Sequence, residues 1–133
     1  MNVFWNIFAS NELRLVLATK PFNMLSTSSF RTLALSFPGT QEQPHFDRTA
    51  FKVTGKRIFA SLHEPSLSAN IKLPLADQAV FCEYDAEAIY PVPNKFGLQG
   101  WTTFELDKLP EEMVSEALLA AHSDVVNSKS GKK

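Results

Sequence analysis

Two prolines one residue apart constrain this chain more than any other feature of its sequence. They lie in the block Tyr90–Gly97 (YPVPNKFG), which leads into the apolar segment Trp101–Leu106 (WTTFEL). Each proline fixes φ, removes a backbone donor and pushes the residue before it toward extended geometry. We therefore predict a rigid connector here, neither an ordinary helix nor a central strand.

The composition predicts one domain with one core. The chain has 133 residues, of which 44% are hydrophobic, including 11 Phe. A folded domain of this size removes roughly two thirds of the extended chain's surface from water, which is adequate without a disulfide or a structural metal. Cys82 is the single cysteine, which fits a reducing compartment. No segment approaches the ~20 apolar residues of a membrane span. We expect a cytoplasmic protein without a cofactor and without a membrane partner.

The chain ends are predicted to lie outside this domain. Residues 1–24 contain short apolar clusters split by polar residues, and they lack the basic start and unbroken apolar run of a secretory signal. Met24 precedes the cluster Ser26–Ser29, which is typical of a helix N-cap and of a domain start. We predict an extension over 1–24, a domain over 25–126 and a disordered lysine-rich tail over 127–133. The alternative is that the extension packs an amphipathic element on the domain.

The remaining pattern predicts a small α+β domain. Apolar spacing indicates a first helix over 28–36, and Gly55 supplies the tight turn of a β-hairpin. The predicted strands are an edge strand or lead-in over 44–48, the hairpin strands 49–53 and 57–62, and strands over 69–73, 88–92 and 101–106. Two further helices are predicted. The first runs from Pro74 to Tyr84, and its inward face is either Leu75, Ala79 and Cys82 or the pair Val80 and Tyr84. The second begins at Pro110 and has an apolar stripe of Val114, Ala117, Leu118, Ala121 and Val125.

Alternation along the strands predicts which side chains share a face of the sheet. Phe51 and Val53 are assigned to the core with Ile58, Ala60 and Leu62, and later strands add Ala69, Ile71, Leu73, Phe104 and Leu106. The opposite, outer surface is predicted to carry Lys52, Arg57, Phe59, Asn70, Lys72 and Trp101.

Several segments together resemble the MmcQ/YjbR family over about Ser28 to Val126. They are Phe37–Thr40 (FPGT), the hairpin Thr49–Ala60, Asn70–Leu73 (NIKL), Tyr90–Lys95 (YPVPNK), Gly100–Phe104 (GWTTF) and the final helix. The resemblance implies a CyaY-like fold, an antiparallel sheet with helices packed on one face. It also implies binding of DNA or another nucleic acid, because the family's sheet looks like a double-wing nucleic-acid binding module, which is an argument from fold analogy.

The outer sheet surface is the first candidate site. Lys52, Arg57 and Lys72 can neutralise phosphates, while Phe59 and Trp101 can stack on bases. The charge is polarised: residues 31–72 carry six basic and three acidic side chains, whereas 73–126 carry two basic and ten acidic ones. The total of −1 is less basic than that of a strong nucleic-acid binder, so a solvated face is the alternative.

The second candidate is Asn94 with Lys95, which a loop held by two prolines can present to a small ligand or a protein partner. Alternatively, Asn94 satisfies backbone groups within its own turn. A protein-interaction or small-ligand module around Trp101 and Asn94 is therefore the second functional hypothesis.

Metal and catalytic sites are the third candidate, and the sequence argues against both. The candidate ligands lack the spacing of known zinc sites: His45, Asp47, His63, Glu64 and His122. Cys82 is followed closely by Glu83 and Asp85, whose negative charges disfavour a thiolate. Consecutive residues of a helix point in different directions, so His122, Ser123 and Asp124 cannot form a triad with one another. We predict no metal site, no catalytic residue and a non-enzymatic protein.

Overall fold

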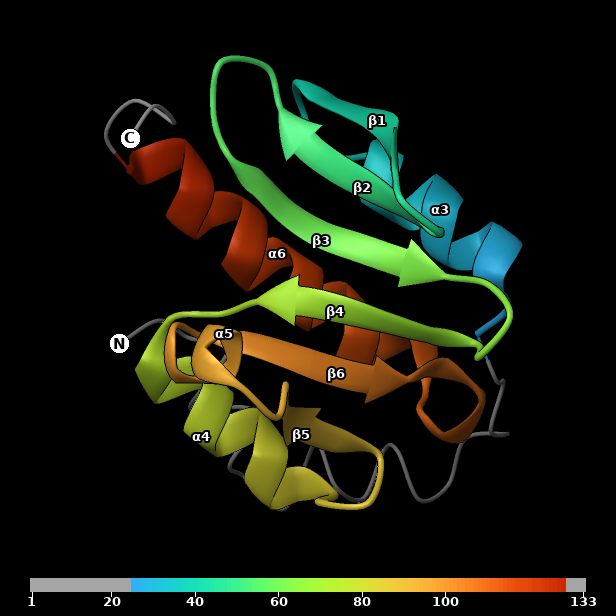
Figure 1. The fold of residues 1–133 in the computed structure, drawn as a ribbon, viewed down its shortest axis with the longest axis vertical. Coiled ribbons are helices and arrows are strands. Elements are labelled where there is room, and N and C mark those ends of the chain that lie inside the picture. The colour runs from blue at the N-terminus through green and yellow to red at the C-terminus, as the bar shows by residue number, and fades with distance from the viewer. Residues whose placement is uncertain (1–24, 129–133) are drawn as a thin grey trace.

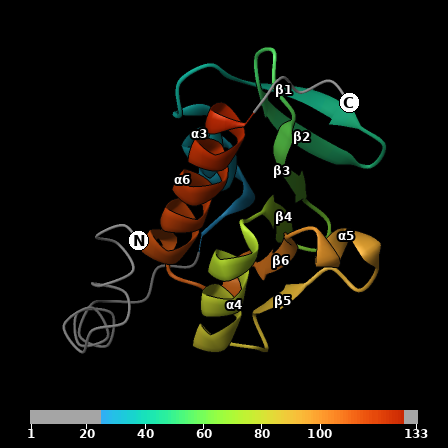
Figure 2. The ribbon, with the colours of Figure 1, turned by 90° about the vertical axis from the view of Figure 1, so that its left-hand side faces the viewer.

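The computed structural model describes residues 25–128, so the predicted extension 1–24 and the last five residues of the predicted tail lie outside the described part. A six-stranded sheet with every pairing antiparallel has the order β1-β2-β3-β4-β6-β5. The helices α3, α4 and α6 lie on one side of it (Figure 1; Figure 2). The predicted α+β class and antiparallel sheet are confirmed.

In chain order the elements are α3 (Thr27–Leu35), β1 (Thr40–His45), β2 (Arg48–Val53), β3 (Ile58–His63), β4 (Ser68–Lys72), α4 (Leu75–Tyr84), β5 (Ile89–Pro91), α5 (Lys95–Leu98), β6 (Trp101–Glu105), the 3-10 turn η1 (Leu106–Lys108) and α6 (Glu111–Asn127).

Helix α3 begins in the predicted serine cluster. The Ser26 hydroxyl oxygen accepts a hydrogen bond from the Ser29 N–H at 3.0 Å, which satisfies a donor that the helix leaves open. Arg31 then donates two hydrogen bonds of 2.8 Å to the Glu42 carboxylate, and this contact lowers the pKa of Glu42. This ion pair connects helix α3 to the edge strand β1.

The edge strand is longer than the sequence indicated. The segment is an edge strand, one of the two predicted alternatives, but β1 covers Thr40–His45 and not 44–48, because Phe46 and Asp47 form the turn and Arg48 begins β2. Its residues Gln41, Glu42 and Gln43 have low strand propensity. An edge strand tolerates such polar residues and Pro44, because one side of it faces solvent. The hairpin that follows turns at Gly55 (φ 80°), as predicted.

A β-bulge overturns the predicted facing of β3. The register pairs Phe51 with Ala60 but Lys52 with Ile58, so one extra residue, Phe59, is inserted. Phe59 is 1% exposed and belongs to the core. The assignment of Phe59 to the outer surface and of Ile58 to the core is therefore wrong.

Helix α4 faces the core only partly as predicted. Cys82 and Val80 are half-buried and pack against the core, whereas Leu75 is 57% exposed and Ala79 is exposed. Phe81 is the fully buried residue of α4, and its ring lies 5.9 Å from that of Phe104. The helix covers only the β5 end of the sheet, so a single large side chain anchors it.

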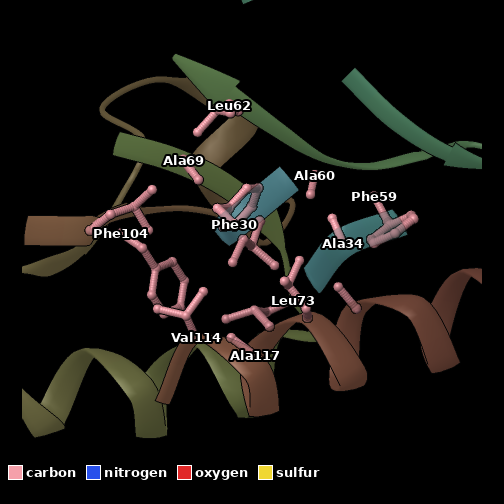
Figure 3. Packing of buried hydrophobic residues seen from close by; sticks show 14 of the residues in the cluster. Phe30, Ala34, Phe59, Ala60, Leu62, Ala69, Leu73, Phe104, Val114 and Ala117 are labelled. Atoms are coloured by element: carbon pink, nitrogen blue, oxygen red, sulfur yellow. The ribbon is translucent and has the colours of Figure 1, made fainter. Parts of the chain in front are cut away.

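Helix α6 supplies the largest helical contribution to the core. All five residues of its predicted stripe are buried. Figure 3 shows two of them, Val114 and Ala117, on the core side of the sheet together with Leu73 and Phe104. The helix continues through Asn127, which the sequence assigned to the tail. Among the helices of residues 25–128, none has the length and apolarity needed to cross a membrane.

Candidate functional site

The outer face of the sheet, opposite α6, contains a groove of about 340 Å³. Figure 2 shows this face from the side, with the β1–β2 hairpin near one end of the sheet and α5 near the other. The lining residues come from five strands and from the segment around α5: His45, Arg48, Ile58, Ser61, Asn70, Val92, Asn94, Phe96 and Trp101.

A row of side chains across the strands forms the groove floor. The register aligns Ser61 with Asn70, and Asn70 with Thr103. Thr103 donates a hydrogen bond to the Asn70 amide oxygen at 2.8 Å, which leaves the Asn70 NH₂ group as a donor toward a ligand. The floor can therefore offer directed hydrogen bonds.

Arg48 holds a positive charge at this floor. Its Nε donates to the Ser61 hydroxyl at 2.8 Å, and one terminal nitrogen lies 3.4 Å from the Ser61 carbonyl oxygen. Burial lowers the pKa of Arg48, yet a guanidinium stays protonated at neutral pH. In the described region, no carboxylate lies within ion-pair distance of Arg48, although the negative charge of Asp47 is near enough to raise the pKa of Arg48 against the effect of burial. The guanidinium has no direct ion-pair partner and can donate hydrogen bonds to an anion.

Trp101 and the residues around α5 form the wall of the groove at the end away from His45 and Arg48. The Asn94 carboxamide oxygen accepts a hydrogen bond from the Phe96 N–H at 2.8 Å and caps α5. Gln78 of α4 braces the segment by donating to the Gly97 carbonyl at 3.0 Å and to the Thr102 hydroxyl at 3.1 Å. Hydrogen bonds from α4 therefore hold the segment that carries Phe96 in place.

The block Tyr90–Gly97 contains the start of the short helix α5, contrary to the expectation that it holds no helix. A proline restricts only itself and the residue before it, so Asn94, after Pro93, is free to start a helical turn.

Two carboxylates beside the outer face, those of Glu105 and Asp47, have hydrogen-bond partners, but only the Glu105 contact with Lys108 is an ion pair whatever the protonation state of His63. Glu105 accepts hydrogen bonds from Lys108, at 2.7 Å, and from the Tyr90 hydroxyl; the Lys108 contact is the larger cause of its lowered pKa. Asp47 lies 3.0 Å from the ring of His63. By contrast, no ion pair within residues 25–128 involves Lys52 or Lys72. The face keeps unpaired positive charge although the whole chain is slightly acidic.

The structure brings only part of the predicted site together. Trp101 and Asn94 line the groove, and the Lys95 ammonium lies 5.7 Å from the centre of the Phe96 ring. Lys52 is on the outer face beside the groove, by alternation with buried Phe51 and Val53. Arg57 and Lys72 instead border a hollow of about 40 Å³ near the end of α6, and Phe59 is on the core side.

Seven of the nine groove residues were not proposed for this site from the sequence: His45, Arg48, Ile58, Ser61, Asn70, Val92 and Phe96, of which His45 was considered only as a metal ligand. Asn70 was assigned to the outer face but not to a site. His45 and Arg48 pair with each other across the β1–β2 turn. The sequence prediction did not include this hairpin, so it did not bring the two residues together.

Two of the candidate metal ligands, His122 and His63, make contacts that hold parts of the fold together. The described residues contain no cluster of three potential metal ligands. The His122 ring donates a hydrogen bond to the Pro38 carbonyl at 2.8 Å and lies between Phe37 and Phe59. His63 lies between Asp47, at 3.0 Å, and Ser66, at 2.7 Å, and so braces the turn after β3.

Cys82 is expected to react slowly in the folded protein, because burial raises the pKa of its thiol and disfavours the thiolate. Iodoacetamide at pH 8, followed by mass spectrometry, should label the native chain much more slowly than the urea-unfolded chain. The unfolded protein is the control, and one cysteine gives one signal. Equal labelling rates would contradict the burial.

Comparisons with known proteins agree with this fold. The family model described as YjbR matches residues 35–123. The crystal structure of Deinococcus radiodurans protein DR2400, a domain of the type DUF419, superposes with a TM-score of 0.68 at 22% sequence identity. The match covers 79% of this chain and 81% of that chain, and at this identity it supports the fold alone. The comparison with curated proteins gave no match.

Proposed function

This chain belongs to the YjbR family, and from that premise and the outer groove we propose that it is a non-enzymatic protein that binds single-stranded nucleic acid. The proposal includes a cytoplasmic location, where single-stranded nucleic acid occurs and where the lone Cys82 would stay reduced. Binding is assigned to the outer sheet face.

One observation carries the proposal: aromatic rings and an unpaired cation line the same groove. Trp101 and Phe96 lie on one wall, and Arg48 lies at the floor. Stacking on an aromatic ring contributes about 1–3 kcal/mol per base, and it requires a base face that a duplex does not expose. Lys52 and Lys95 flank the groove and can neutralise phosphates, which adds sequence-independent affinity.

A second candidate is a small anionic ligand with a planar ring, such as a free nucleotide. The groove volume of about 340 Å³ is within the range of small-ligand pockets, and Asn70 can supply directed hydrogen bonds. The two candidates differ in length dependence, since a groove for one nucleotide gains nothing from a longer strand.

Replacing Trp101 with alanine is expected to weaken binding of single-stranded oligonucleotides by about 5- to 150-fold, which is the loss of one stacked base. Duplex binding should change much less. The measurement is fluorescence anisotropy of labelled single- and double-stranded DNA of the same sequence. A mononucleotide and strands of two to twelve nucleotides serve as competitors.

Charge removal gives an independent expected result. Lys52→Gln and Lys95→Gln should each flatten the salt dependence of binding by roughly one unit of slope, because each of these flanking lysines is proposed to contact a phosphate. Lys56→Gln is the matched control, because the Lys56 ammonium donates to the Ser128 carbonyl at 2.7 Å, beside the end of α6. The absence of any binding by the unmodified protein at low salt and high micromolar concentration would refute the proposed function.

A further inference from the structure

The turn between β1 and β2 has an unusual residue at its tip. His45 pairs with Arg48, so Phe46 and Asp47 are the two turn residues. Phe46 has φ 59°, whereas Asp47 does not have a positive φ. A two-residue hairpin turn with positive φ at its first position favours glycine there. A bulky aromatic residue at this position is strained.

Packing does not explain why phenylalanine occupies this position. The Phe46 side chain is 95% exposed, the highest value among the large hydrophobic residues exposed in the described region. The residue therefore combines backbone strain, which lowers stability, with an apolar ring that contributes no burial to offset it. Strain that the fold does not need is typical of residues that act on a partner.

The location of Phe46 connects it to the groove. Its ring centre lies 5.0 Å from that of His45, and His45 lines the groove. Arg48, two residues further along the same hairpin, lies at the groove floor. Phe46 thus lies at the hairpin end of the groove, with the unpaired guanidinium of Arg48 near it, whereas Trp101 and Phe96 are on the α5 side.

We propose that Phe46 is a stacking residue for an unpaired base, and that it extends the nucleic-acid site beyond the groove. This inference rests on the proposed function and deepens it. A strand bound this way stacks one base on the Trp101 wall and a further base on Phe46, and its phosphate charge faces Arg48. The favoured ligand is therefore an oligonucleotide with several unpaired bases rather than a single nucleotide.

The test replaces Phe46 with glycine, which relieves the strain and removes the ring. We expect a melting temperature that is unchanged or a few degrees higher, together with single-strand binding that is weaker by about 5- to 150-fold. Affinity for a mononucleotide should stay unchanged, because the groove is intact. Phe46→Tyr should keep the affinity for the oligonucleotide.

Leu67→Gly is the matched control. Leu67 also has positive φ (54°) and is 45% exposed, but it lies in the turn before β4 and does not line the groove. Its replacement should likewise leave the melting temperature unchanged or raised, without any loss of binding.

The outcomes separate this inference from the proposed function. If the unmodified protein binds the oligonucleotide and Phe46→Gly binds equally well, the stacking role is wrong while the groove proposal stands. A lowered melting temperature for Phe46→Gly, or equal weakening by Leu67→Gly, would also overturn the inference, since the effect would then come from the fold. No binding by the unmodified protein would overturn both.

Discussion

Replacing Phe59 with alanine is expected to lower the free energy of unfolding by about 3–5 kcal/mol, the usual cost of truncating a buried phenylalanine. The ring is 1% exposed, and its centre lies 5.6 Å from that of His122 on α6. Its removal would open a cavity between the sheet and that helix. The effect is large against a total stability of about 5–15 kcal/mol, and urea titration followed by circular dichroism measures it.

The neighbouring residue provides the control. Ile58 lines the outer groove and is half-buried, so Ile58→Ala should cost clearly less, about 1 kcal/mol. Phe51→Ala, which removes another fully buried ring, should match Phe59→Ala. A larger loss for Ile58 than for Phe59 would mean that the strand has no bulge and that simple alternation holds.

The bulge could not be predicted because the sequence around it contains no marker. Ile58 and Phe59 are adjacent and both apolar, so either can face the core. An inserted residue reverses the facing of one end of a strand relative to the other, and period-two reasoning cannot locate it without a polar residue that would be buried. Where polar and apolar residues alternate, as in β4, the predicted facing is confirmed for Ala69 and Ile71.

Helix α6 was predictable for a similar reason. Its apolar stripe is repeated over four turns between acidic and polar residues, so a single helical face satisfies the whole pattern. Helix α4 is apolar on several sides, and its facing depends on how little of the sheet it covers, which no local pattern encodes.

The groove depends on topology that the sequence does not display. Asn70 and Trp101 come together because β4 pairs with β6, whereas α4, β5 and α5 intervene in the chain. Arg48 lies at the same site because it is the first residue of β2, directly after the β1–β2 turn. The sequence predicted this segment as an edge strand or a lead-in and not as a hairpin. Trp101 and Asn94 could be proposed from strand parity and the proline block, but their partners required the strand order.

Replacing Gly100 with alanine is expected to cost about 3 kcal/mol of stability or more, and to disturb the wall that carries Trp101. Gly100 has φ 109°, and a Cβ atom there would lie 2.0 Å from the Leu73 carbonyl oxygen. Backbone strain of about 1–3 kcal/mol and a steric penalty of similar size therefore act together. The same backbone is held by a 2.9 Å hydrogen bond from the Leu73 N–H to the Gly100 carbonyl, so it has little freedom to move away.

Two further glycines separate the contributions. Gly55→Ala introduces strain without contact, since Gly55 has φ 80° and a Cβ atom there would meet no other atom within 4 Å, so its cost should be about 1–2 kcal/mol. Gly97→Ala introduces a contact of 2.0 Å with the Val92 carbonyl oxygen without a positive φ, and it should displace Phe96 and weaken ligand binding. Denaturant titration and oligonucleotide binding of all three variants test this account. Gly100→Ala combines both penalties, so it should lower the free energy of unfolding more than Gly55→Ala does. An equal or smaller loss would contradict a close contact between Gly100 and the Leu73 carbonyl oxygen.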